Sequence, residues 1–161
     1  MIAVRRPLLL ACLTAVVLVL AGCGHHEGSR DSIATADSTS PTSAVAWIQD
    51  YYKAINEHRY RDAYAHWEQG GLASGKSFAE FRKGFEETER VEVTVGAPGP
   101  IGAAAGSRYV EVPVRIAARI RDGTRQDYSG SYTLRLSVVD GATPEQRSWH
   151  INSAAVHSVF E

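Results

Sequence analysis

The sequence predicts an α+β domain in which three N-terminal helices pack on a curved antiparallel sheet of about four strands. Apolar residues recur at helical spacing up to about residue 89, and from residue 90 onward they alternate with polar residues. Two Asp-Gly pairs, at residues 122–123 and 140–141, favour tight turns between strands, because such turns need positive φ. Each predicted strand is apolar on one face, so the helices are expected to cover that face.

The helical half divides into three segments. The first helix is expected within residues 40–58, and the second within residues 60–67, before a Gly-Gly pair. Ser77 and Glu80 have the spacing of a capping box, which places the start of the third helix at Ser77. The apolar stripes are Ala44, Trp47, Ile48, Tyr51 and Ile55 on the first helix, Tyr60, Ala63, Tyr64 and Trp67 on the second, and Phe78, Phe81 and Phe85 on the third.

Strands are predicted at residues 90–95, 110–121, 125–138 and 149–152. Their inward positions hold Val, Ile, Ala, Leu, Tyr, Gly and Trp, whereas the strand acids Glu92, Glu111 and Asp127 fall on the outward positions. Pro113 has no N–H to donate, so a bulge or an edge position is expected there. The glycine-rich stretch at residues 96–106 is interpreted as a flexible connection between strands.

Three stretches together resemble the nuclear transport factor 2-like superfamily: "AVAWIQDYYKAINEHRYRDAYAHW", "SFAEFRKGF" and "SWHINSA". The resemblance covers roughly residues 44–157 and implies an α+β cone with a cavity between helices and sheet. Ketosteroid isomerase and scytalone dehydratase share that fold and work in that cavity, and the outer sheet face often forms a dimer. A pattern of elements without a catalytic motif supports the fold far more than a function.

The N-terminal segment has the features of an export signal. Arg5 and Arg6 precede an apolar run too short to span a bilayer, and small residues follow it. Leu20-Ala21-Gly22-Cys23 resembles the lipobox of bacterial lipoproteins, in which the chain is cut before the cysteine and the thiol carries lipid. Residues 1–22 are therefore expected to be a signal peptide, 23–43 the lipidated Cys23 with a linker, and 44–161 the domain. A plain cleaved signal peptide and an uncut anchor are the alternatives.

The resemblance also predicts a location in the cell envelope. The membrane partner would be reached through lipid on Cys23, and several acyl chains make such an anchor effectively permanent. Gly24 follows the cysteine where Asp would favour the inner membrane, so the periplasmic face of the outer membrane is expected in a Gram-negative host. Otherwise the outer face of the cytoplasmic membrane is expected. Cys12 lies in the signal peptide, so no disulfide is expected in the mature chain.

Charge and composition limit which classes of partner and ligand are expected. Without Arg5 and Arg6, 15 basic side chains remain against 18 acidic ones, so nucleic acid is not expected as a partner. His25-His26-Glu27 could hold a metal weakly, but metal sites need three or four converging ligands. These residues are interpreted as part of a solvated tether, and no metal or cofactor is expected.

The sequence offers one weak catalytic candidate. His58 and Asp62, and Asp62 and His66, are spaced so that each pair could touch on a helix. A His–Asp pair could act as a general base in an isomerase-like or dehydratase-like enzyme. These residues lie on the polar side of short helices, however, so a surface role is the favoured interpretation and no catalytic residue is assigned.

Two binding sites are therefore the leading hypotheses for a non-catalytic binding or interaction module. A structural envelope protein without a ligand is the alternative, and a filled interior would favour it. A small apolar ligand could lie in the cone, whereas a second copy or another envelope protein could bind the outer sheet face. The predicted pocket lining is Tyr51, Tyr64, Phe81, Tyr128, Tyr132 and Trp149, and the predicted interface is Arg115, Arg119, Arg125 and Arg135.

Overall fold

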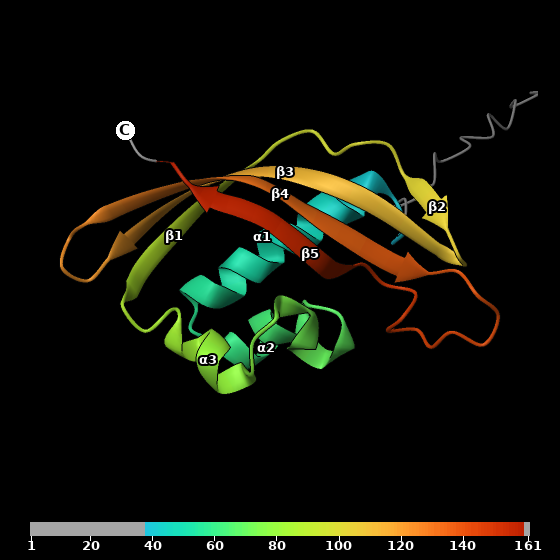
Figure 1. The fold of residues 1–161 in the computed structure, drawn as a ribbon, viewed down its shortest axis with the longest axis horizontal. Helices are drawn as coiled ribbons and strands as arrows, with labels where there is room; N and C mark the ends of the chain where they lie inside the picture. The colour runs from blue at the N-terminus through green and yellow to red at the C-terminus, as the bar shows by residue number, and fades with distance from the viewer. Residues whose placement is uncertain (1–37, 160–161) are drawn as a thin grey trace, which may run out of the picture. The chain divides into compact units, whose positions relative to one another are not determined.

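A computed structural model describes residues 38–159 and places helices against one face of an antiparallel sheet (Figure 1). The predicted fold class is confirmed, with five strands rather than about four. The elements in chain order are α1 (Pro41–Asn56), α2 (Tyr60–Ala65), the 3₁₀ helix η1 (Gln69–Ser74), α3 (Phe78–Lys83), β1 (Thr88–Val95), β2 (Gly102–Ala104), β3 (Ser107–Ile120), β4 (Arg125–Ser137) and β5 (His150–Ser158).

The sheet is built around the long hairpin of β3 and β4. Its strand order is β1-β3-β4-β5, and β2 pairs with β3 on the side that β1 occupies further along. The extra strand β2 lies within residues 96–106, which had been interpreted as a flexible connection. Pro113 lies between the stretches of β3 that pair with β1 and with β2, and its carbonyl accepts a hydrogen bond from the Gly96 N–H.

Local capping explains where the helices begin. The Ser40 Oγ accepts a hydrogen bond from the Ser43 N–H, and α1 starts at Pro41, three residues before the expected domain boundary at residue 44. The capping box of α3 is confirmed, because the Ser77 and Glu80 side chains each accept from the backbone N–H of the other. The helix η1 follows α2, and the predicted Gly-Gly break falls inside it.

The core lies between the helices and the inner face of the sheet. Val110, Val112 and Val114 of β3 are buried, whereas Glu111 and Arg115 between and beyond them are exposed, as the alternation predicts. The described residues, 38–159, belong to one compact unit that contains all of this core. A unit with its own core is able to fold by itself, so this segment is suitable for experiments.

Several expectations concern the chain before residue 38. Gly22, Cys23, the signal peptide and most of the expected linker lie outside the described residues. Within residues 38–159, every helix is too short or too polar to cross a bilayer.

Candidate functional site

The interior contains a group of aromatic side chains contributed by helices and sheet. Tyr51 and Tyr52 of α1 face Tyr132 of β4, and all three are at most 5% exposed. The hydroxyls of Tyr52 and Tyr132 are 2.6 Å apart and share a buried hydrogen bond. Phe81 of α3 lies 6.5 Å from Tyr51 between ring centroids, and Trp67 lies 6.3 Å from it. Side-chain packing therefore fills this part of the space between the layers.

The buried tyrosines are neutral hydroxyls rather than bases. Burial raises the pKa of Tyr51, Tyr52 and Tyr132, since the phenolate form loses its hydration. The neighbouring tyrosines raise the pKa of Tyr51 and Tyr52 further. At neutral pH this group can donate and accept hydrogen bonds, but it has no charge with which to remove a proton.

One polar atom of this group lacks a regular partner. The Trp67 indole N–H is buried and makes no hydrogen bond of regular geometry, although it approaches the Tyr51 hydroxyl closely enough to lower the pKa of that hydroxyl. Buried donors are nearly always satisfied, so this N–H marks the position where a bound acceptor would gain most. The apolar stripes predicted from the sequence place Trp67 in the core but do not assign it to the pocket. They omit Tyr52, although it follows Ile48 at helical spacing.

The structure brings together four of the six predicted lining residues. Tyr64 packs on Phe81 with ring centroids 5.2 Å apart, close to Tyr51 and Tyr132. Trp149 is buried elsewhere, at the start of α1, where its indole N–H lies 3.1 Å from the Ser40 carbonyl oxygen. Tyr128 is only partly buried.

The hydroxyl of Tyr128 donates to the Gln126 side chain in an exposed hydrogen bond, and the residue lines an open hollow on the sheet. Its ring also packs against the hydrophobic core, so Tyr128 lies at the margin of the predicted lining rather than in its buried part. Tyr128 pairs with the buried Ile116 of β3, which places its side chain on the inner face of the sheet.

The His–Asp pairs predicted from spacing do not form a catalytic unit. The Asp62 carboxylate accepts from the Arg59 Nη1 at 2.5 Å and is exposed. The His66 Nδ1 contacts the Asp62 backbone oxygen at 2.8 Å rather than the carboxylate. His58 is exposed and its ring lies against Tyr60. Burial lowers the pKa of His66, which keeps that ring neutral at neutral pH.

The outer face of the sheet carries an open hollow of about 720 Å³. Arg115 of β3 lies there in register with Thr94 of β1 and Ser129 of β4. The next row toward the β3–β4 turn holds Glu92, Ala117 and Asp127, and the row after that holds Arg90, Arg119 and Arg125. Three of the four predicted interface arginines therefore lie together, joined by Arg90, which the sequence analysis did not include.

Arg135 belongs to a separate network at the other end of this face. Its Nη1 donates to the Glu68 carboxylate at 2.5 Å, and its Nε donates to the Ser107 Oγ at 2.9 Å. Asn152 donates to the other Glu68 oxygen at 2.6 Å. Because this guanidinium is occupied inside the molecule, Arg135 is less suited to an interface than the other three arginines.

No cluster of three or more potential metal ligands occurs among the described residues. No family profile matches the chain, and no curated protein is similar to it in sequence.

Solved structures share its fold at low sequence identity. The Kfla4162 protein from Kribbella flavida is 11% identical with a TM-score of 0.51, over 74% of this chain and 90% of that protein. A proposed scytalone dehydratase from Novosphingobium aromaticivorans is 10% identical with a TM-score of 0.53, over 74% and 83%. A proposed dehydratase of the nuclear transport factor 2-like family from Streptomyces avermitilis is 10% identical with a TM-score of 0.50, over 74% and 97%. The chain therefore has a nuclear transport factor 2-like fold.

Proposed function

We propose that this chain is an exported, lipid-anchored binding module that acts without catalysis and binds a protein partner through the outer face of its sheet. The partner is a second copy of the chain or another envelope protein. The lipobox-like sequence ending at Cys23 supports the anchor, and the fold supports a binding module.

The observation that carries the choice of face is the contrast between the two sides of the sheet. On the inner side, aromatic rings contact one another and two hydroxyls satisfy each other. On the outer side, a broad hollow exposes Arg115 between the short side chains of Thr94 and Ser129. Arginine is enriched at protein interfaces, because its planar head donates several hydrogen bonds and its stem packs well.

Two measurements on residues 33–161 test the interface. Sedimentation equilibrium measures self-association, and Arg115→Glu is expected to weaken any dimer at least about tenfold, because it reverses a charge at the contact. Arg82→Glu on the helical side of the sheet is the control. If the wild type is a monomer, a photo-crosslinker at Ser129 in the full chain should capture an envelope protein that one at Arg82 does not. A monomer with no Ser129 crosslink would refute the proposed interface.

Lipid attachment has its own test. Metabolic labelling with a palmitate analogue is expected to label the full chain, and Cys23→Ser should abolish the label. Cys12→Ser is the matched control and should leave the label unchanged, because Cys12 precedes the expected cleavage site. A label that survives Cys23→Ser would show that the anchor is elsewhere.

A second candidate is a small hydrogen-bond acceptor bound next to the Trp67 N–H, which makes no hydrogen bond of regular geometry. Native mass spectrometry of residues 33–161 isolated from the periplasm would show extra mass that disappears on unfolding. Trp67→Phe should reduce that mass, whereas Tyr128→Phe should not. An isomerase-like or dehydratase-like activity is the remaining alternative, and the Asp62–Arg59 pair disfavours it because it occupies the candidate base.

A further inference from the structure

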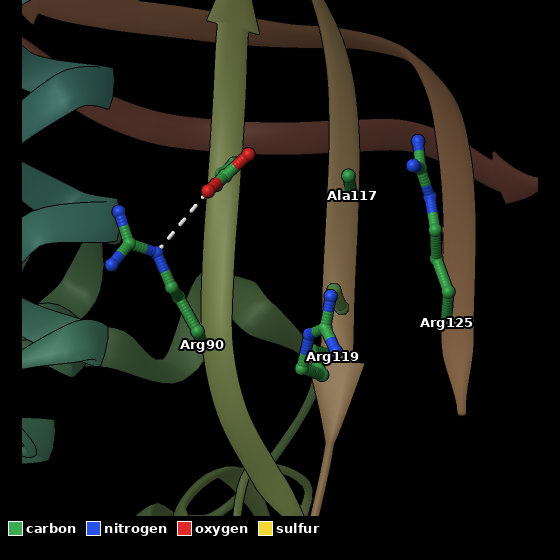
Figure 2. A pocket seen from close by; sticks show the side chains of 6 residues that line it. Arg90, Ala117, Arg119 and Arg125 are labelled. Carbon is green, nitrogen blue, oxygen red and sulfur yellow. Dashed lines mark ion pairs between the residues drawn. The ribbon is translucent and has the colours of Figure 1, made fainter. Parts of the chain in front are cut away.

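We infer that the row of three arginines across β1, β3 and β4 is a binding site for a tetrahedral phosphate group. Figure 2 shows Arg90, Arg119 and Arg125 on three neighbouring strands, and these residues and Ala117 are among those that line a small hollow. This site adjoins the hollow of the protein interface proposed above and shares Glu92, Ala117 and Arg125 with it. The inference does not depend on that interface.

The strand register produces the row. Arg119 of β3 lies directly opposite Arg90 of β1 and directly opposite Arg125 of β4. Like charges opposite one another on paired strands are destabilising. The sheet therefore carries a local repulsion that a bound anion would relieve, and such a ligand would stabilise the fold.

The neighbouring acids compensate the outer two arginines but not the central one. The Arg90 Nε lies 3.2 Å from a carboxylate oxygen of Glu92. The Arg125 Nε and Nη2 donate to the Asp127 carboxylate at 2.8 and 2.7 Å. Among the described residues, Arg119 has no carboxylate within ion-pair distance. The guanidinium of Arg119 is therefore the group whose charge a ligand would neutralise.

The dimensions of the hollow select the ligand. Its volume is about 80 Å³, and Ala117 contributes a small side chain to its lining. At about 30 Å³ per water molecule, this space holds the equivalent of two or three waters, which suits a single phosphate group. Arginine recognises phosphate well because its planar fork donates parallel hydrogen bonds, and a phosphate offers three acceptor oxygens to a row of such forks.

Calorimetric titration of residues 33–161 with sodium phosphate, at constant ionic strength set by chloride, tests the site. The wild type should bind saturably, and Arg119→Gln should bind about tenfold more weakly or worse. Ala117→Leu should weaken binding similarly, because it fills the hollow without changing any charge. Arg82→Gln, which removes an exposed arginine from α3, is the control and should bind like the wild type.

The stability of the variants separates lost binding from lost folding. Without phosphate, Arg119→Gln should melt at the wild-type temperature or above it, since it removes the like-charge contacts. Phosphate should raise the melting temperature of the wild type more than that of Arg119→Gln. Absence of saturable binding in the wild type, or equal weakening by Arg82→Gln and Arg119→Gln, would overturn the inference.

Two probes distinguish the source of the phosphate. Glycerol 1-phosphate represents a soluble monoester, and dihexanoyl phosphatidylglycerol below its micelle concentration represents a lipid headgroup. Binding of either that depends on Arg119 supports the site and identifies the source. Failure of both probes and of inorganic phosphate would refute it.

Discussion

Tyr132→Phe should destabilise the domain, although it removes a single oxygen atom. The Tyr132 hydroxyl is the hydrogen-bond partner of the Tyr52 hydroxyl at 2.6 Å, and both side chains are 5% exposed. Loss of one hydroxyl leaves the other buried without this partner, which costs about 1–3 kcal/mol. For a domain of this size, that corresponds to a loss of roughly 4 °C in melting temperature per kcal/mol.

The double variant makes this prediction sharper. Tyr52→Phe alone should cost about the same as Tyr132→Phe, because it leaves the opposite hydroxyl unpaired. Replacing both tyrosines removes the two polar groups together and should cost less than the sum of the single changes, since an apolar pair of the same shape has nothing to desolvate. A coupling free energy of about 1 kcal/mol or more is expected.

Urea denaturation of residues 33–161, followed by tryptophan fluorescence, measures all four proteins. Tyr128→Phe is the matched control, because its hydrogen bond to Gln126 is exposed and its loss should change stability by less than about 0.5 kcal/mol. If the two single variants are as stable as the wild type, or if the double variant costs the full sum, the buried hydroxyl pair does not contribute as the structure indicates.

Four further outcomes are expected for residues 33–161. Stability should fall as pH rises above about 10, the tyrosine pKa of the unfolded chain, because burial raises the folded-state pKa; Tyr51→Phe should reduce this loss in alkaline urea titrations. Stability should also fall below about pH 6.5, because burial lowers the pKa of His66; His66→Gln should flatten that dependence. Gly130→Ala should prevent stable folding, because its Cβ would lie 1.9 Å from a carbonyl oxygen of β5, whereas Gly123→Ala has space for its Cβ and should retain a cooperative thermal melt. Asn56→Ala should cost about 1–2 kcal/mol in urea, because the side-chain amide makes two 2.8 Å hydrogen bonds to the backbone of β1.

The elements that sequence predicted well are those with local chemical signals. The capping box at Ser77 and the turn at Gly123, whose φ is +89°, depend on residues adjacent in the chain. Alternation predicted the faces of β3 because helices cover one side of it. The strand predicted at residues 149–152 ends earlier than β5, which continues to Ser158. Beyond Asn152 most residues are small and exposed on both faces, so no alternation of apolar and polar residues marks the strand.

Contacts that compete with those allowed by spacing determine the surroundings of His66 and Arg135. Spacing allowed His66 to reach the Asp62 carboxylate, but Arg59 is also within reach and its charge-assisted bond prevails. In the same way, the alternation along the strand predicted that Arg135 lies on the outer face with Arg115, Arg119 and Arg125. Its pairing with Glu68 depends on the bridge that joins Trp67 to β5, a contact between segments about 80 residues apart that no local pattern encodes.

The arginine row shows most clearly what one-dimensional patterns omit. Arg119 and Arg125 could be related through the predicted turn between them, whereas Arg90 comes from a strand whose register depends on a bulge near Thr88. A shift of β1 by one residue would turn Arg90 to the inner face and separate it from Arg119. Register converts three ordinary surface arginines into a concentrated positive site, and it places Glu92 and Asp127 one row away, where they compensate the flanking charges. The central charge of Arg119 is therefore a property of the assembled sheet, which is why the outer face deserves functional tests as much as the interior from which the fold's enzymes are known.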